Sequence, residues 1–199
     1  MPYNADSLAE IVCTGLDALI KPRERLDIAG FSFGGLIGGH VAERLGARAQ
    51  SLVLVGSGGL GIPRGATIEL SSWRELPTQA EQMAAHRRNL EVLMIADPAN
   101  IDDLAIYLQS RNAARGRLKS RPLSRIASLR TVLPKMTARL HGLWGERDIT
   151  AEGTLEEHAR LLRSIQSTAR FIVIERAGHW VQYEAAPRFN AALVNLLTV

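Results

Sequence analysis

The strongest constraint on the fold is a serine flanked by glycines, between an apolar run and a helical stretch. Residues 26–29 suit a short buried parallel strand, and residues 36–45 have a helical pattern. Between them, residues 30–34 match G-x-S-x-G with Ser32 at the centre. Such a strand–turn–helix unit is a nucleophile elbow, whose small residues two positions from the serine let strand and helix approach closely. Ser32 is therefore the candidate nucleophile.

Helical and strand patterns alternate along the rest of the chain. Further buried strands are expected at residues 51–56, 139–145 and 170–175, and helices at 6–19, 155–167 and 183–197. Strands separated by helices predict an α/β fold with a parallel, doubly wound sheet.

A long helical block interrupts this alternation. A Gly-rich loop over residues 56–65 leads into a mostly helical pattern over residues 67–128. We expect this block to be an inserted cap, or lid. The chain then divides into a first core part with the elbow (1–60), the helical cap (61–130) and a second core part (131–199).

Two further polar residues follow buried strands, where open α/β sheets place their sites. Asp148 comes after the third strand and His179 after the fourth. Each has a structural alternative, because Asp148 can cap the next helix and His179 can be an ordinary loop residue. The order Ser32, Asp148, His179 is nevertheless the order of a Ser-His-Asp triad on this kind of sheet.

These motifs resemble the α/β-hydrolase family. The elbow (30–35) and residues 145–148 and 178–182 carry the resemblance. Residues 56–61 and the stretch after His179 are similar to meta-cleavage product hydrolases, which cleave a carbon–carbon bond in ring-fission products of aromatic catabolism. The resemblance implies hydrolysis of a small carboxylic ester, or of a 2-hydroxy-6-oxo-dienoate type of ketone after ketonisation of the dienol.

Roles for the site residues follow from this interpretation. His179 would take the proton of Ser32 and deliver it to the leaving group, while Asp148 would hold the imidazole tautomer. The backbone N–H of Phe33 would donate to the oxyanion. Trp180 would line the pocket, with packing support as its equally plausible role.

The charge pattern bears on the substrate. A net charge of +4 comes with scattered arginines and only 5% aromatic residues, so nucleic acid is not an expected partner. The densest basic stretch, residues 111–130, is either a solvated helix face or a clamp for an anionic small molecule. The resemblance implies a carboxylate-binding arginine in the cap. Arg111 lies in about the right place, with Arg115 and Arg117 as competitors.

Several classes of protein are disfavoured. No apolar run is long enough for a membrane span, and the first residues do not form a signal peptide. A single cysteine, Cys13, is compatible with a cytoplasmic protein. No cofactor or metal is expected, since there is no Cys/His cluster. The remaining helical histidines, His40, His86 and His158, are interpreted as surface or helix residues.

The segment before the elbow strand holds only one helix. Complete α/β-hydrolase domains have several strands there, one of which supplies a second oxyanion donor, so the chain is expected to be N-terminally truncated. Loss of one such donor slows turnover by roughly 10²–10³. The exposed strand edge would favour a homo-oligomer. The alternative function is therefore a catalytically impaired homologue with a binding role, or a gene fragment.

Overall fold

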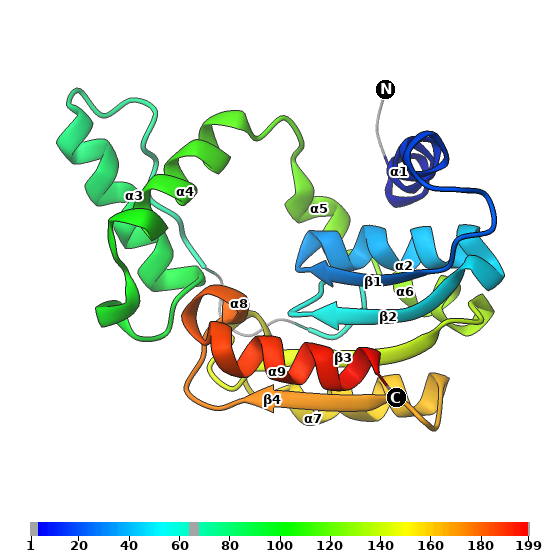
Figure 1. The fold of residues 1–199 in the computed structure, drawn as a ribbon. Helices are drawn as coiled ribbons and strands as arrows, with labels where there is room; N and C mark the ends of the chain where they lie inside the picture. Colours follow the sequence, from blue (N-terminus) through cyan, green and yellow to red (C-terminus); the bar gives the residue numbers. More distant parts are fainter. Residues whose placement is uncertain (1–3, 64–67, 199) are drawn as a thin grey trace.

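The fold is a parallel four-stranded sheet with helices on both faces (Figure 1). The computed structural model describes residues 4–63 and 68–198. The strands are all parallel and stand in the order β1-β2-β3-β4. They are β1 (Leu26–Phe31), β2 (Ala49–Val55), β3 (Arg139–Gly145) and β4 (Arg170–Ile174). The predicted fold class is confirmed.

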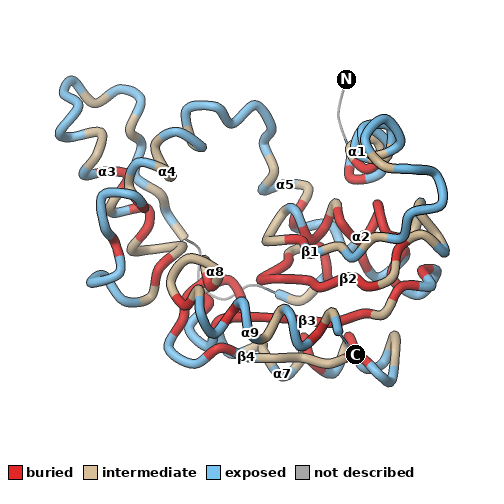
Figure 2. Tube along the Cα trace, viewed as in Figure 1, coloured by how far each residue is buried: buried red, intermediate tan, exposed pale blue. Residues whose placement is uncertain are grey.

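Two helical layers cover the sheet. The core helices are α1 (Ala5–Leu19), α2 (Phe33–Leu45), α7 (Leu155–Ile165), α8 (Val181–Glu184) and α9 (Ala186–Leu197). Alternate side chains of β2 enter opposite clusters: Leu52 and Leu54 pack with α2 and α7, whereas Val53 and Val55 pack with α9. A strand buried on both faces has no solvent-facing side, which explains the continuous apolar run over residues 52–55 of this strand (Figure 2).

The described residues between β2 and β3 include four α-helices. They are α3 (Gln79–Leu93), α4 (Asp103–Arg115), α5 (Ser120–Ser124) and α6 (Leu129–Val132). Short 3₁₀ turns complete the chain: η1 (Gly46–Arg48), η2 (Pro98–Asn100), η3 (Leu133–Lys135) and η4 (Ile149–Ala151). The helices α3 and α4 pack on each other beyond one end of the sheet, while α5 and α6 return to α2 (Figure 1).

The expected helical block begins later than its pattern indicated. The positions Gly65 and Thr67, where the loop was expected to end and the helix to begin, lie outside the described residues. Residues 68–78 are not helical, and the side chain of Asn89 bonds both backbone groups of Ser71 within this segment. Helix α3 starts only after Thr78, whose side chain forms a capping box with Glu81.

The last helix is also different from the prediction. Instead of one helix over residues 183–197, α8 ends at Glu184 and α9 begins at Ala186. Pro187 stands in the first turn of α9, where its missing N–H is tolerated, but it could not lie inside a continuous helix.

Strand β1 lies at the edge of the sheet. It pairs with β2 on one side, and no other described strand pairs with it. Beyond β1, helix α1 packs on α2. The homo-oligomer expected from an open edge stays a prediction. No helix in the described ranges is long and apolar enough to cross a membrane.

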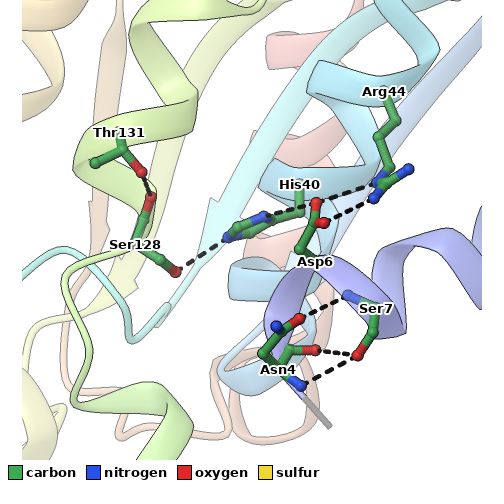
Figure 3. Close-up of polar contacts among 7 residues, drawn as sticks. All are labelled: Asn4, Asp6, Ser7, His40, Arg44, Ser128 and Thr131. Carbon is green, nitrogen blue, oxygen red and sulfur yellow. Dashed lines mark hydrogen bonds and ion pairs between the residues drawn. The ribbon is translucent and has the colours of Figure 1, made fainter.

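A polar cluster attaches α1 and α6 to α2, the helix that follows Ser32 (Figure 3). The carboxylate of Asp6 receives two hydrogen bonds from the guanidinium of Arg44, the shorter at 2.8 Å. His40 Nε2 lies 3.0 Å from the hydroxyl of Ser128, just before α6. Asn4 and Ser7 form the capping box that begins α1. These contacts join three segments that are far apart in the sequence.

The helical histidines are not surface residues. His40, His86 and His158 are 6%, 1% and 6% exposed, so that part of the sequence interpretation is wrong. They occupy the buried faces of their helices. The hydrophobic periodicity of the sequence could not predict that a polar histidine would lie on such a face. Burial is the main cause that lowers the pKa of each, and it lowers the pKa of His141 in β3 as well.

We expect acid destabilisation that begins near neutral pH. A histidine whose pKa is lower in the folded state binds fewer protons there than in the unfolded chain. Stability is therefore lost as the pH falls through the unfolded value of 6.5. The urea midpoint should be lower at about pH 5.5 than at about pH 7.5, and His86→Phe should flatten this dependence. A urea midpoint at about pH 5.5 that equals or exceeds the midpoint at about pH 7.5 would contradict the lowered histidine pKa values.

Candidate active site

Ser32 sits at a sharp turn between β1 and α2. Its φ of 51° lies in the left-handed region, which a non-glycine residue adopts only where the surrounding structure enforces it. Its backbone N–H donates to the carbonyl of Val55 at 2.8 Å, which fixes the turn to the end of β2. The strand–turn–helix context predicted for the elbow is confirmed.

The glycines around Ser32 have unequal roles. A Cβ on Gly30 would lie 2.5 Å from the Cα of Gly35 and 2.6 Å from the carbonyl oxygen of Gly34. A Cβ on Gly34 would meet no atom within 4 Å. The close approach of strand and helix therefore requires glycine before the serine, as predicted. The prediction was wrong for Gly34, because that residue faces outward and Gly35 makes the close contact instead.

Asp148 uses its two carboxylate oxygens for two different tasks. Oδ1 accepts hydrogen bonds from the backbone N–H of Thr150 at 2.9 Å and from its hydroxyl at 2.7 Å. Oδ2 lies 2.8 Å from Nδ1 of His179. Asp148 thus caps the turn that follows, the structural alternative weighed from the sequence, and also contacts the histidine. Thr150 is a supporting residue that no sequence pattern singled out.

His179 lies between the acid and the serine. A carboxylate only accepts hydrogen bonds, so Nδ1 carries the proton, and Nε2 is left as the acceptor for the Ser32 hydroxyl at 3.0 Å. The imidazole is 3% exposed and packs on the ring of Phe31 with centroids 4.9 Å apart. The three residues predicted together are therefore brought together, by hydrogen bonds between segments that are far apart in sequence.

Phe33 is the first residue of α2. The first N–H groups of a helix have no partner within it, so the Phe33 N–H is free to donate to an anion beside Ser32. Phe33 also lines the cavity onto which Ser32 opens. These placements agree with the donor position expected for Phe33, and its oxyanion role stays a prediction.

A cavity of about 660 Å³ opens beside Ser32 and His179. The 57–63 loop and Met94 form parts of its wall, and the segment 120–125 closes another side. Backbone hydrogen bonds tie the loop to that segment, from Gly59 N–H to the Ser124 carbonyl, and to the start of α6, from Leu129 N–H to the Gly59 carbonyl. The cavity wall is therefore built partly from the core and partly from α5.

The arginines of the cavity are not the expected ones. Arg121 and Arg125, on and just after α5, line the cavity that contains Ser32. Arg111 is exposed on α4 and lines a separate groove between α3 and α4, together with Met83 and Tyr107. The assignment of Arg111 to the pocket is not supported, because its helix face turns toward α3. Arg121 and Arg125 belong to the basic stretch 111–130 noted in the sequence. Their spacing did not distinguish them from the other arginines of that stretch.

Trp180 supports the structure instead of lining the cavity. Its ring stacks on Tyr183 and packs on the small apolar cluster of α3 and α4. Its backbone N–H donates to the carbonyl of Met94 at 2.6 Å. The hydroxyl of Tyr183 donates to Asp102. Burial, with that carboxylate, raises the pKa of Tyr183 to about 12. Packing support, the second role considered for Trp180, is the one that these contacts favour.

Glu184 holds the loop that carries His179. Its carboxylate accepts from the N–H of Gly178 at 2.6 Å, and from those of Ala96 and Asp97 at 3.0 and 2.8 Å. One side chain thus joins the residue before His179 to the segment after α3. A carboxylate five residues after the histidine was visible in the sequence, but its partners come from the cap, so sequence spacing could not identify them.

A second Ser-His-Asp grouping lies in the polar cluster of Figure 3. His40 Nε2 is 3.0 Å from the Ser128 hydroxyl, but its Nδ1 is 3.9 Å from Asp6, whose carboxylate is engaged by Arg44. Neither of the two cavities described above is lined by these residues. Ser128 is therefore a natural control for experiments on Ser32. Within the described ranges, no three His, Cys, Asp or Glu residues are grouped to hold a metal ion.

Several proteins of known structure have a similar fold. A meta-cleavage product hydrolase (CumD) from Pseudomonas fluorescens IP01, solved with acetates, is 21% identical, with a TM-score of 0.73 over 99% of this chain and 72% of that chain. The 2-hydroxy-6-oxo-6-phenylhexa-2,4-dienoate hydrolase from Rhodococcus sp. strain RHA1 is 18% identical, with a TM-score of 0.66 over 98% and 73%. A bromoperoxidase from Bacillus anthracis is 17% identical, with a TM-score of 0.72 over 100% and 76%.

Identities this low show a shared fold and not a shared substrate. A comparison with curated protein sequences gave no match. The sequence model of the alpha/beta hydrolase family, however, matches residues 2–192, nearly the whole chain. The chain therefore belongs to the alpha/beta hydrolase family.

Proposed function

We propose that the protein is a serine hydrolase that cleaves a small carboxylic ester, or the carbon–carbon bond of a ring-fission product, with Ser32, His179 and Asp148 as its catalytic residues. One observation carries the proposal. The Ser32 hydroxyl, both ring nitrogens of His179 and Oδ2 of Asp148 form an unbroken hydrogen-bonded chain at the wall of a cavity.

The chemistry follows from this chain of bonds. Ser32 Oγ attacks the substrate carbonyl carbon while His179 Nε2 takes the hydroxyl proton, and Asp148 stabilises the imidazolium that forms. The oxyanion accepts a hydrogen bond from the Phe33 N–H. His179 then protonates the leaving group, and water, activated by the same nitrogen, hydrolyses the acyl-enzyme and restores the Ser32 hydroxyl.

The cavity favours a substrate with a carboxylate. Two arginines, Arg121 and Arg125, line the same cavity as the reactive serine, and a guanidinium binds a carboxylate in a bidentate manner. One structural neighbour, the Rhodococcus hydrolase, acts by its name on a dienoate, which is anionic. These observations support an acidic ester or dienoate over a neutral ester.

Removal of the cavity arginines should raise KM for acidic substrates selectively. The double variant Arg121→Ala/Arg125→Ala is expected to raise KM for the p-nitrophenyl monoester of succinic acid by about 10- to 100-fold, because a charge-assisted hydrogen bond contributes about 1.5–3 kcal/mol. KM for the neutral p-nitrophenyl butyrate should change less than about threefold. The test is steady-state hydrolysis of both esters.

Arg111→Ala provides the matched control, because that arginine is exposed outside the cavity. It should leave KM for both esters unchanged. If Arg111→Ala raised KM for the acidic ester and the double variant did not, the assignment of the cavity arginines would be wrong. If the wild-type protein hydrolysed neither these esters nor a ring-fission dienoate, the proposed activity itself would be contradicted.

A further inference from the structure

A second histidine forms part of the cavity wall. His158, on α7, lines the same cavity as Ser32 and His179 and is 6% exposed. Its ring packs against Trp144, with centroids 5.2 Å apart and an angle of 50° between the planes. This packing and the buried face of α7 fix the ring in place. The proposed hydrolytic chemistry does not use it.

The hydrogen bonding of His158 determines its tautomer. Nδ1 lies 2.8 Å from the carbonyl oxygen of Thr154, and a carbonyl can only accept, so Nδ1 carries the proton. In the neutral ring Nε2 is then an acceptor. Burial, the main cause, lowers the pKa of His158 and so favours that neutral form.

Within residues 4–63 and 68–198, Nε2 of His158 has no hydrogen-bond partner, and it is not one of the fully buried atoms that lack a partner, so it keeps contact with the cavity. Water or a ligand group in the cavity can therefore donate a hydrogen bond to this acceptor. Arg121 and Arg125 only donate, whereas hydroxyl side chains of the cavity, such as Thr150, can donate as well as accept. Nε2 of His158, an acceptor in the cavity wall, therefore suits a donor group of the ligand, whereas the arginines suit an anionic group.

We propose that His158 is a specificity-determining residue, which accepts a hydrogen bond from an uncharged hydroxyl or N–H group of the substrate through Nε2. The inference rests on the proposed function, because it concerns the same cavity. It deepens that function by naming a second recognition element. The preferred substrate would carry a donor group in addition to the cleaved bond, and an analogue that lacks the donor would leave the Nε2 acceptor unsatisfied.

The test compares esters that differ by one hydroxyl. Short aliphatic esters are paired with esters of equal chain length that carry a hydroxyl at successive positions of the acyl or the alcohol part. For at least one position, wild-type kcat/KM should be about tenfold higher for the hydroxylated ester. His158→Phe, which keeps a ring but removes the acceptor, should abolish that preference. His158→Gln, which restores an acceptor, should recover part of it.

His86→Phe is the control for replacing a buried histidine. His86 is likewise buried against a tryptophan, Trp73, but does not line the cavity. This variant should keep the hydroxyl preference. If no hydroxyl position is preferred by the wild type, or if the preference survives in His158→Phe, the inference is wrong.

A second readout does not depend on turnover. In protein with ¹⁵N-labelled histidine, the Nε2 resonance of His158 should have the shift of an unprotonated nitrogen. It should move on saturation with the hydroxy acid or diol that carries the hydroxyl of the preferred ester, but not with the unsubstituted acid or alcohol. Hydrolysis of neither an ester nor a ring-fission dienoate would refute the proposed function, whereas an Nε2 resonance that is protonated, or that does not respond to that hydroxylated ligand, would refute the role of His158.

Discussion

Replacement of His179 by alanine is expected to reduce kcat for any accepted ester by about 10⁶-fold, to the level left by binding and the oxyanion donor. Without the imidazole, the Ser32 hydroxyl keeps its proton and is a poor nucleophile. The measurement is the hydrolysis of p-nitrophenyl esters by purified protein of verified fold. A variant that kept more than about a hundredth of wild-type kcat would contradict the role of His179 as general base.

Asp148→Asn keeps the size of the Asp148 side chain but removes its negative charge. The amide can still cap the turn at Thr150, but it can offer its N–H to the imidazole and so favour the wrong tautomer. A loss of about 10⁴-fold in kcat with an unchanged fold is expected. Together with the result for His179→Ala, this loss would assign His179 as the general base and Asp148 as the carboxylate that orients it.

A second large effect is expected on stability. Gly30→Ala should lower the free energy of unfolding by at least about 3 kcal/mol, because the new Cβ would press on backbone atoms of Gly34 and Gly35 that cannot move aside. For a domain of this size, such a loss lowers Tm by roughly 6–12 °C. Thermal unfolding followed by circular dichroism measures it directly.

Gly34→Ala is the matched control, with the same substitution four residues later. Its Cβ meets no atom within 4 Å, and the residue is exposed in the first turn of α2. We expect a change of less than about 0.5 kcal/mol, or a gain of up to about 1 kcal/mol from the lower entropy of the unfolded chain. A Tm equal to the wild-type value in Gly30→Ala would refute the account of the elbow.

The parts of the fold that sequence could predict are those with local causes. Strand β2 is buried on both faces, and its residues 52–55 form an unbroken apolar run. The elbow combines a strand, a glycine turn and a helix within twenty residues. The break at Ala185, between α8 and α9, and the non-helical segment 68–78 were missed. The first depends on where α8 ends, and the second includes a contact between Ser71 and Asn89 across 18 residues.

The residues of the candidate site also divide into those that local sequence could predict and those that it could not. Ser32, Asp148 and His179 could be found because each follows a strand, and parallel strands bring their ends to one edge of the sheet. The cavity residues Arg121, Arg125 and His158 could not, because their positions depend on how α5 and α7 pack. A histidine on an apolar helix face gives no sign of whether it faces a core or a cavity.

Labelling with a fluorophosphonate probe tests the central claim most directly, because it requires an activated serine and no knowledge of the substrate. The account predicts that the wild-type protein and Ser128→Ala are labelled, that mass spectrometry places the adduct on Ser32, and that Ser32→Ala is not labelled. Absence of labelling in folded wild-type protein, or labelling that persists in Ser32→Ala, would contradict an assembled Ser32–His179–Asp148 site and favour a binding role for the chain.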